Sequence, residues 1–221
     1  MRGRMRCRKA GEQYMKTGIG MIAVLAAAVC AANLMQTAQD LRTVEQSVIR
    51  LHIRANSDST ADQTVKLAVR DALLEHAADW MPQEGDPEAR CRALQGHLPE
   101  MQETARAALN AAGCGDAVSV SFGETAFPAR EYGAVTLPAG TYRAVRVEIG
   151  SGEGQNWWCV MYPAMCVPAA AENAAEETLS GGALEIVTQP EKYEVRLKCV
   201  EVWRAVVRRI RTASAEMGGG I

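Results

Sequence analysis

Hydrophobic and polar residues alternate over residues 49–55, which predicts a strand with one buried and one solvated face. The isoleucines lie on the side that is expected to enter the core. Residues 56–59 are small and polar, so they predict a corner, and Ser59 with Asp62 fits a variant of the capping box. Apolar residues then recur at three- and four-residue spacing as far as Trp80. This stretch therefore predicts a strand, a corner and a helix of about five turns.

The middle of the chain predicts a second helix and a short strand. Residues 86–87 are Asp-Pro, an N-cap signal followed by a proline in the first helical turn, and Pro99 predicts a kink or break near His97. Alternation over residues 118–122 predicts a strand. Residues 123–140 contain two prolines and several glycines, so we expect a long surface loop with at most a short strand in it.

The last third of the chain predicts two strands and a terminal helix. A glycine-rich turn separates residues 141–149 from residues 157–162, which predicts that the two strands pair as an antiparallel hairpin. Residues 168–182 are alanine-rich and acidic, and they predict a short solvated helix or a mobile segment. Pro190 opens a helix with an apolar stripe and a basic end, for which we consider a packed terminal helix and contact with a membrane surface. The basic end contains Arg204, Arg208, Arg209 and Arg211.

These elements predict a single domain of the mixed α/β (α+β) class, in the order β-α-α-β-β-β-α. A small mixed or antiparallel sheet of about four strands would be packed by about three helices. A basic head at residues 1–18 and an uncharged run at residues 19–35 come first. The run suits a signal peptide or a short membrane anchor, so an exported globular domain at residues 36–213 is expected in both cases. Residues 214–221 predict a flexible tail.

The exported part is acidic, which argues against one class of partner. Residues 36–221 hold 18 basic and 25 acidic residues, a net charge of −7. Binding to nucleic acid needs concentrated lysine and arginine, so we expect no nucleic acid as a partner. Aromatic residues are scarce and concentrate only at residues 157–162, which makes that run more informative than its length indicates.

Three widely separated stretches carry a resemblance to a known family. They are RLHIRANSDSTADQTVKLAVRDA at residues 50–72, GQNWWCVMYPAMC at residues 154–166 and, more weakly, FPAREYGAVTLPAGTYRAVRVEIG at residues 127–150. The chain resembles the stage II sporulation protein R family of endospore-forming bacteria. The resemblance extends over approximately residues 49–209 and is weak over residues 85–115 and 168–190.

The resemblance implies an exported signal that passes between the two compartments of a sporulating cell. Such a protein would be made in the forespore and exported into the space between the septal membranes, either secreted or anchored to the outer face of the forespore membrane. Its partner would be a membrane-embedded aspartic protease, which releases the mother-cell sigma factor, sigma-E, from its precursor. The resemblance carries over no catalytic residues, so we expect no enzymatic activity, no cofactor and no small-molecule substrate.

The alternative is a cell-envelope hydrolase or another extracytoplasmic enzyme that uses Cys159 or Asp58. Gln155 lies upstream of Cys159 and faintly resembles the arrangement in papain-type cysteine proteases. However, no glycine-rich nucleophile turn surrounds Cys159, and the candidate bases lie in unrelated contexts. These bases are His52 on the solvated face of the first strand, His76 on the apolar stripe of the first helix, and His97.

Residues 56–62 place oxygen-bearing side chains at alternate positions, as calcium loops do. The pattern fails where a calcium loop is most restrictive, because Ala61 replaces the glycine and Leu67 replaces the bidentate glutamate. Capping of the helix is the better explanation for these polar residues. We therefore expect no metal site.

Cys159 and Cys166 bracket a proline-containing corner in a part of the chain that is expected outside the reducing cytosol. A disulfide between them is predicted, and a pair of buried free thiols is the alternative. The sequence leaves the redox states of Cys91, Cys114 and Cys199 open.

Recognition of a protein partner is the chemistry that this sequence favours. Tryptophan, tyrosine and arginine dominate the energetics of protein interfaces, and they occur together in the stretches that carry the resemblance. Trp157 and Trp158 are neighbours on one predicted strand, so they must point to opposite faces of the sheet. The predicted partner-binding residues are Arg50, Arg54, Asn56, Asp58, Trp157, Trp158 and Tyr162.

Overall fold

The computed structural model describes most of the chain, namely residues 2–82, 86–165 and 170–218. The chain forms two compact units. The larger unit, Leu41–Glu191, contains the sheet and the helices that cover it, and the smaller unit contains the two terminal segments, Met1–Asp40 and Lys192–Ile221. Each unit is described separately below.

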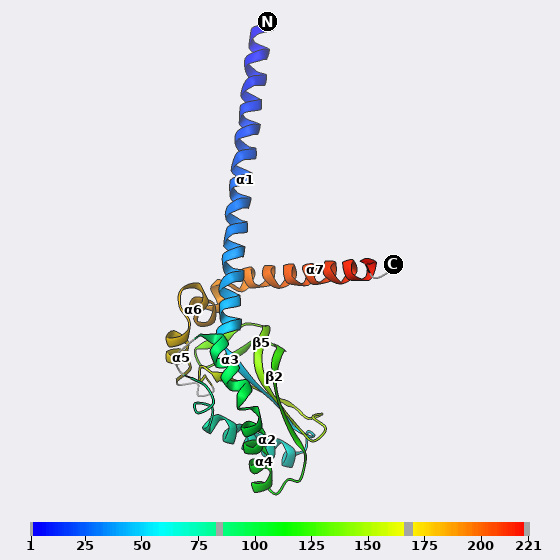
Figure 1. The fold of residues 1–221 in the computed structure, drawn as a ribbon. Helices are drawn as coiled ribbons and strands as arrows, with labels where there is room; N and C mark the ends of the chain where they lie inside the picture. The colour runs from blue at the N-terminus through cyan, green and yellow to red at the C-terminus, as the bar shows by residue number, and fades with distance from the viewer. Residues whose placement is uncertain (1, 83–85, 166–169, 219–221) are drawn as a thin grey trace. The chain divides into compact units, whose positions relative to one another are not determined.

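A four-stranded sheet forms the centre of the larger unit, with the strand order β2-β5-β1-β6 (Figure 1). Its strands are β1 (Ile49–Arg54), β2 (Val118–Phe127), β5 (Gly140–Ile149) and β6 (Asn156–Tyr162). β1 is parallel to β5 and antiparallel to β6, and β2 is antiparallel to β5. The predicted mixed α/β class with a sheet of about four strands is confirmed.

The predicted hairpin of β5 and β6 is wrong, because β1 lies between these strands and pairs with both. The chain that joins β5 to β6 therefore passes the end of β1. A central strand is covered on both faces and hydrogen-bonded on both edges, which favours the most apolar strand in that place. β1 fits this position because Ile49 to Ile53 are all buried.

Three helices cover one face of the sheet. They are α2 (Thr60–Glu75), α3 (Pro87–Gly96) and α4 (Leu98–Ala111). Leu51 and Ile53 of β1 join Val69 and Leu73 of α2 in a core that is removed from solvent. This core confirms the prediction that the apolar stripe of the first helix packs on the preceding strand.

Local signals fixed most of the helix ends. Ser59 Oγ accepts a hydrogen bond from Asp62 N, and Asp86 caps α3. The helix is interrupted at His97, between α3 and α4, as the position of Pro99 predicts. α2 is shorter than expected, because it ends at Glu75 and the chain reaches buried Trp80 through turns.

The opposite face of the sheet is partly covered by chain that was expected to be a loop or solvated. β2 continues to Phe127, and a hairpin of β3 (Arg130–Tyr132) and β4 (Val135–Leu137) follows it. Two short helices, α5 (Ala171–Thr178) and α6 (Gly181–Thr188), contact β4. The short helix among the predicted alternatives is confirmed, but both helices bury apolar side chains and are therefore not fully solvated; residues 168–169 lie outside the described part of the chain.

The prediction that β1 has one solvated face is also wrong. Arg50 is fully buried and His52 is 9% exposed, although both lie on the strand face opposite the three helices. The alternation of polar and apolar residues predicted correctly which residues share each face of the strand. It could not predict that the β3–β4 hairpin, which lies far away in the sequence, covers Arg50 on the polar face.

Long helices make up the smaller unit. α1 (Arg2–Ser47) extends from the basic head through the apolar run, and its last turns belong to the larger unit, where Leu41 and Val44 are buried. Its Gly20–Ser47 part is long and apolar enough to cross a membrane, which fits a signal peptide or a membrane anchor. A short 3-10 helix, η2 (Pro190–Lys192), precedes α7 (Glu194–Gly218), which extends past the predicted end of the domain at residue 213.

Candidate functional site

The corner after β1 is joined to the loop before β6 by a group of hydrogen bonds, which we call the corner–loop junction (residues 55–59 and 150–155). Asn56 Oδ1 accepts from Ser151 N at 2.9 Å, and Asn56 O accepts from Ser151 Oγ at 2.8 Å. Asp58 Oδ1 accepts from Gln155 N at 2.7 Å. Two predicted partner-binding residues, Asn56 and Asp58, therefore have structural partners within the domain.

Two glycines allow the close approach at this junction. Gly150 has φ +58°, and a Cβ atom there would overlap the Asn56 side chain and lie 2.6 Å from Asn56 Cγ. A Cβ atom at Gly154 would meet the backbone of Ser57, with its carbonyl carbon at 2.6 Å. Glycine is therefore required at both positions by contact, and at Gly150 also by backbone conformation.

Two charged residues of α2, Asp62 and Lys66, also hold the junction together, which the sequence patterns did not reveal. Ser57 Oγ donates to Asp62 Oδ2 at 2.5 Å, and this hydrogen bond lowers the pKa of Asp62. Lys66 is only 4% exposed and donates from Nζ to Gln155 O at 3.0 Å. Burial lowers the pKa of Lys66, and the charge of Asp58 opposes this shift. Lys66 thereby ties α2 to the start of β6.

The two tryptophans of β6 point to opposite faces of the sheet, as predicted. Trp157 packs against the helix-side core, where the guanidinium of Arg70 lies 4.5 Å from its ring centre. Trp158 stacks on His52 with ring centres 3.9 Å apart and an interplanar angle of 12°. Both rings are half-buried, so each is partly covered by other side chains of the domain and partly accessible to solvent.

Arg50 was predicted to contact a partner, but the structure buries it completely. Its guanidinium lies 4.1 Å from the ring centre of Phe127 and 5.0 Å from that of Tyr142. Nη2 donates to the Tyr132 hydroxyl at 2.6 Å, whereas Nε and Nη1 have no hydrogen-bond partner among the described residues. Burial lowers the pKa of Arg50, and the surrounding rings offset part of this cost through cation–π interactions. Arg50 is thus part of the core.

His52 lies next to Arg50 on the same strand face and at the border between covered and open sheet. Its Nε2 donates to Asn156 Oδ1 at 2.6 Å. Burial lowers the pKa of His52, and the hydrogen bond with Asn156 raises it by a smaller amount. The imidazole therefore favours its neutral form, which suits a ring stacked on Trp158.

Beyond His52 the same face of the sheet is open to solvent. β1, β5 and β6 place their side chains there in register, with Arg54 beside Glu148 on one side and Asn156 on the other. Arg54 and Glu148 form an exposed ion pair at 3.7 Å. We call this surface the open sheet face, and it consists of Arg54, Arg146, Glu148, Asn156 and Trp158.

The remaining predicted partner-binding residue, Tyr162, lies away from the open sheet face. A register shift between Ile49 and Arg50 turns Tyr162 toward the helices, where the guanidinium of Arg90 lies 4.3 Å from its ring centre. Of the seven predicted residues, the structure therefore brings Arg54 and Trp158 together on one accessible surface. Arg146 and Asn156 join them there, and only the pairing of the strands reveals these two.

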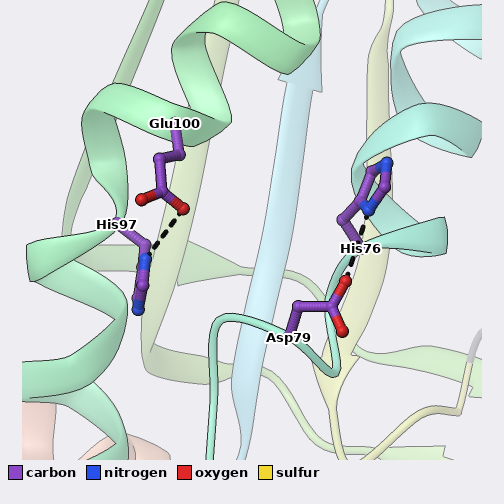
Figure 2. Close-up of polar contacts among 4 residues, drawn as sticks. All are labelled: His76, Asp79, His97 and Glu100. Carbon is purple, nitrogen blue, oxygen red and sulfur yellow. Dashed lines mark hydrogen bonds and ion pairs between the residues drawn. The ribbon is translucent and has the colours of Figure 1, made fainter.

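The residues of the enzyme alternative do not form a catalytic arrangement in the described parts of the chain. Cys159 is disulfide-bonded and 3% exposed within the helix-side core, so its sulfur is not a free nucleophile. The Asp58 carboxylate accepts a hydrogen bond from Gln155 N, which gives it a structural role. Figure 2 shows the other two histidines in separate local pairs, His76 with Asp79 at 3.3 Å and His97 with Glu100 at 2.9 Å.

His76 was expected on the buried stripe or its boundary, but it caps the C-terminus of α2 and its side chain is 51% exposed. Its pairing with Asp79 spans three residues and is local.

Within the part of the chain that the structure describes, no group of three or more histidine, cysteine, aspartate or glutamate side chains is arranged to hold a metal ion.

The predicted disulfide falls partly outside the described residues. Cys159 is disulfide-bonded, but Cys166 lies at residues 166–169, which are not described. The Cys159–Cys166 pairing therefore stays a prediction. Cys91, Cys114 and Cys199 are free thiols.

Comparison with known proteins covers the part of the chain that contains the junction and the open sheet face. A family model described as stage II sporulation protein R matches residues 45–172, more than half of the chain. The protein of Bacillus subtilis (strain 168) named stage II sporulation protein R is 37% identical over 123 residues, which are 56% of this chain and 55% of that protein. The match thus spans about half the length of this curated relative. No solved structure matches. With its β1 corner and its β6 strand inside the matched range, the chain belongs to the stage II sporulation protein R family.

Proposed function

We propose that this protein is the exported signal that activates a membrane-embedded aspartic protease across the sporulation septum. The protease then processes the precursor of sigma-E. Membership of the family indicates a role in sporulation. The apolar part of α1 fits export from the forespore into the space between the septal membranes, with the domain either secreted or anchored to the outer face of the forespore membrane.

The observation that carries this proposal is the convergence of two stretches that lie about a hundred residues apart in the sequence. β1 with its corner and β6 with its preceding loop are neighbours in the sheet, and they share the open sheet face. Arg54 and Asn156 lie side by side there, and Trp158 forms its buried edge. An arginine and a tryptophan on a rigid sheet match the composition of interface hot spots.

Rigidity of this surface supports binding over chemistry. The corner–loop junction fixes both strands at the end where the open sheet face lies, through Asn56, Asp58 and Lys66. A preorganised surface loses little conformational entropy when it binds a partner. The junction residues thus act as supports, and the contacts are assigned to the exposed side chains above them.

The test uses charge and size changes on the open sheet face. We would express the full chain together with the protease and the precursor sigma factor, and measure precursor processing for the double variant Arg54→Ala/Arg146→Ala and for Trp158→Ala. Arg106→Ala is the control, because Arg106 is an exposed arginine in an ion pair, as Arg54 is, but it pairs with Glu103 on α4, on the other side of the sheet.

Processing should fall at least fivefold in the double arginine variant and remain unchanged in Arg106→Ala. Circular dichroism and detection outside the cytoplasm would confirm that each variant is folded and exported. If the folded, exported double variant and Trp158→Ala both support full processing, the activating surface is elsewhere.

A further inference from the structure

The C-terminal helix α7 presents large apolar side chains to solvent. Val195 is 76% exposed, Val202 is 64% exposed and Trp203 is 67% exposed. These residues and exposed Cys199 recur at spacings of three and four, so they share one side of the helix. This side is therefore a continuous apolar stripe that the described part of the chain leaves uncovered.

The charges of α7 are opposite to those of the domain that precedes it. Residues 194–221 hold six basic and three acidic residues, a net charge of +3, whereas residues 36–193 hold 12 basic and 22 acidic residues, a net charge of −10. Arg208 and Arg209 are exposed beyond the apolar stripe. Basic charge is thus concentrated on the same helix that exposes its apolar side chains.

An anionic lipid surface fits both properties of this helix. Helices that lie in the membrane interface combine an apolar side containing tryptophan with lysine and arginine at the border, because the apolar side enters the acyl region while the cations remain among phosphate groups. The chain also contains a membrane-length apolar segment, Gly20–Ser47, and its N-terminal part belongs to the same unit as α7. Among the described helices α7 itself does not qualify as a membrane span, so it would lie on the bilayer.

We propose that α7 binds the surface of an anionic lipid bilayer, with Val195, Val202 and Trp203 inserted and the arginines among the headgroups. This attachment would hold the domain at the membrane whether or not the α1 segment is cleaved. The inference does not depend on activation of a protease. It concerns a part of the chain that lies outside the family match at residues 45–172.

The experiment measures how close Trp203 lies to lipid. The full chain is reconstituted into vesicles of phosphatidylcholine with phosphatidylglycerol, with bromines near the headgroup end of the acyl chains, and quenching of tryptophan fluorescence is recorded. Trp203→Phe should lose most of the quenching that bromolipid causes. Trp80→Phe is the matched control and should retain it, because Trp80 is 5% exposed within the larger unit.

Charge provides the second arm of the experiment. Quenching should fall at least twofold in vesicles of phosphatidylcholine alone and in the variant Arg208→Glu/Arg209→Glu, which leaves the apolar stripe intact. The proposal is overturned if Trp203→Phe is quenched as strongly as the unchanged chain. Equal quenching in neutral and anionic vesicles would also overturn it, since the surface recognised would then not be anionic.

Discussion

The corner–loop junction predicts strong energetic coupling between Asn56 and Gly150. The Asn56 side chain accepts from Ser151 N and donates to Asp62, and it occupies the space where a Cβ atom at Gly150 would lie. An alanine at Gly150 must therefore displace Asn56 from its hydrogen bonds. The same bonds are lost in Asn56→Ala, so the two changes remove one set of interactions.

The size of the coupling follows from these contacts. Asn56→Ala removes two hydrogen bonds that contribute about 0.5–1.5 kcal/mol each, so the free energy of unfolding should fall by about 1–3 kcal/mol. Gly150→Ala adds about 1 kcal/mol for an alanine at φ +58° to the same loss. The double variant should lose only about 2–4 kcal/mol, which leaves a coupling of about 1–3 kcal/mol.

The assay is urea unfolding of the full chain in mild detergent, followed by tryptophan fluorescence in a Trp203→Phe background so that the signal comes from the larger unit. Gly152→Ala is the matched control. Gly152 has φ +64°, but no atom lies closer than 3.7 Å to a Cβ atom built there, so only the backbone cost applies and coupling to Asn56→Ala should be near zero. If Gly150→Ala costs no more than Gly152→Ala, or if its coupling to Asn56→Ala is absent, the junction does not have the rigidity that we assign to it.

Three further predictions test export, the disulfide and the buried histidine. A reporter that works only outside the cytoplasm, fused after Ile221, should be active, and a stable but inactive fusion would place the domain in the cytosol. Mass analysis of non-reduced peptides should find Cys159 joined to Cys166, and free thiols at both would contradict the prediction. Because burial lowers the pKa of His52 in the folded protein, the unfolded protein binds a proton at this residue more readily. The contribution of neutral His52 to stability is therefore present above a pH of about 6.5 and is lost as the pH falls through the pKa of His52 in the folded protein. His52→Gln should weaken this dependence in urea unfolding between about pH 7 and pH 5, and an unchanged slope would refute it.

Local structure was predictable because its causes lie within a few residues. Ser59 caps α2, Asp86 caps α3, and Pro99 separates α3 from α4, as their positions in the sequence predicted. The opposite directions of Trp157 and Trp158 follow from the strand period alone. Each of these features depends on backbone geometry that neighbouring residues determine.

The composition of the candidate site was only partly predictable. Arg54 and Trp158 belong to the open sheet face, but Arg50 is in the core and Asn56 and Asp58 support the junction. Polar residues in an alternating strand look alike whether the strand is at an edge or in the centre. The scarce aromatic residues were a signal that could have found the Arg50 environment, which Phe127, Tyr132 and Tyr142 build from separate places in the chain.

The sequence by itself determined most of the helices and strands, the apolar N-terminal segment, the acidic charge of the domain and the family, since these properties depend on local stretches or add up along the chain. Tertiary structure alone decided that β1 separates β5 from β6, that the β3–β4 hairpin covers one end of the polar face of β1, and that Lys66 is buried. Which strands pair depends on whether the free energy gained by burying whole strands exceeds the entropy lost when the long loops between them close. Segments about a hundred residues apart contribute to this balance together. No local pattern contains this information, and for that reason the partner of each polar side chain became known only when the sheet was assembled.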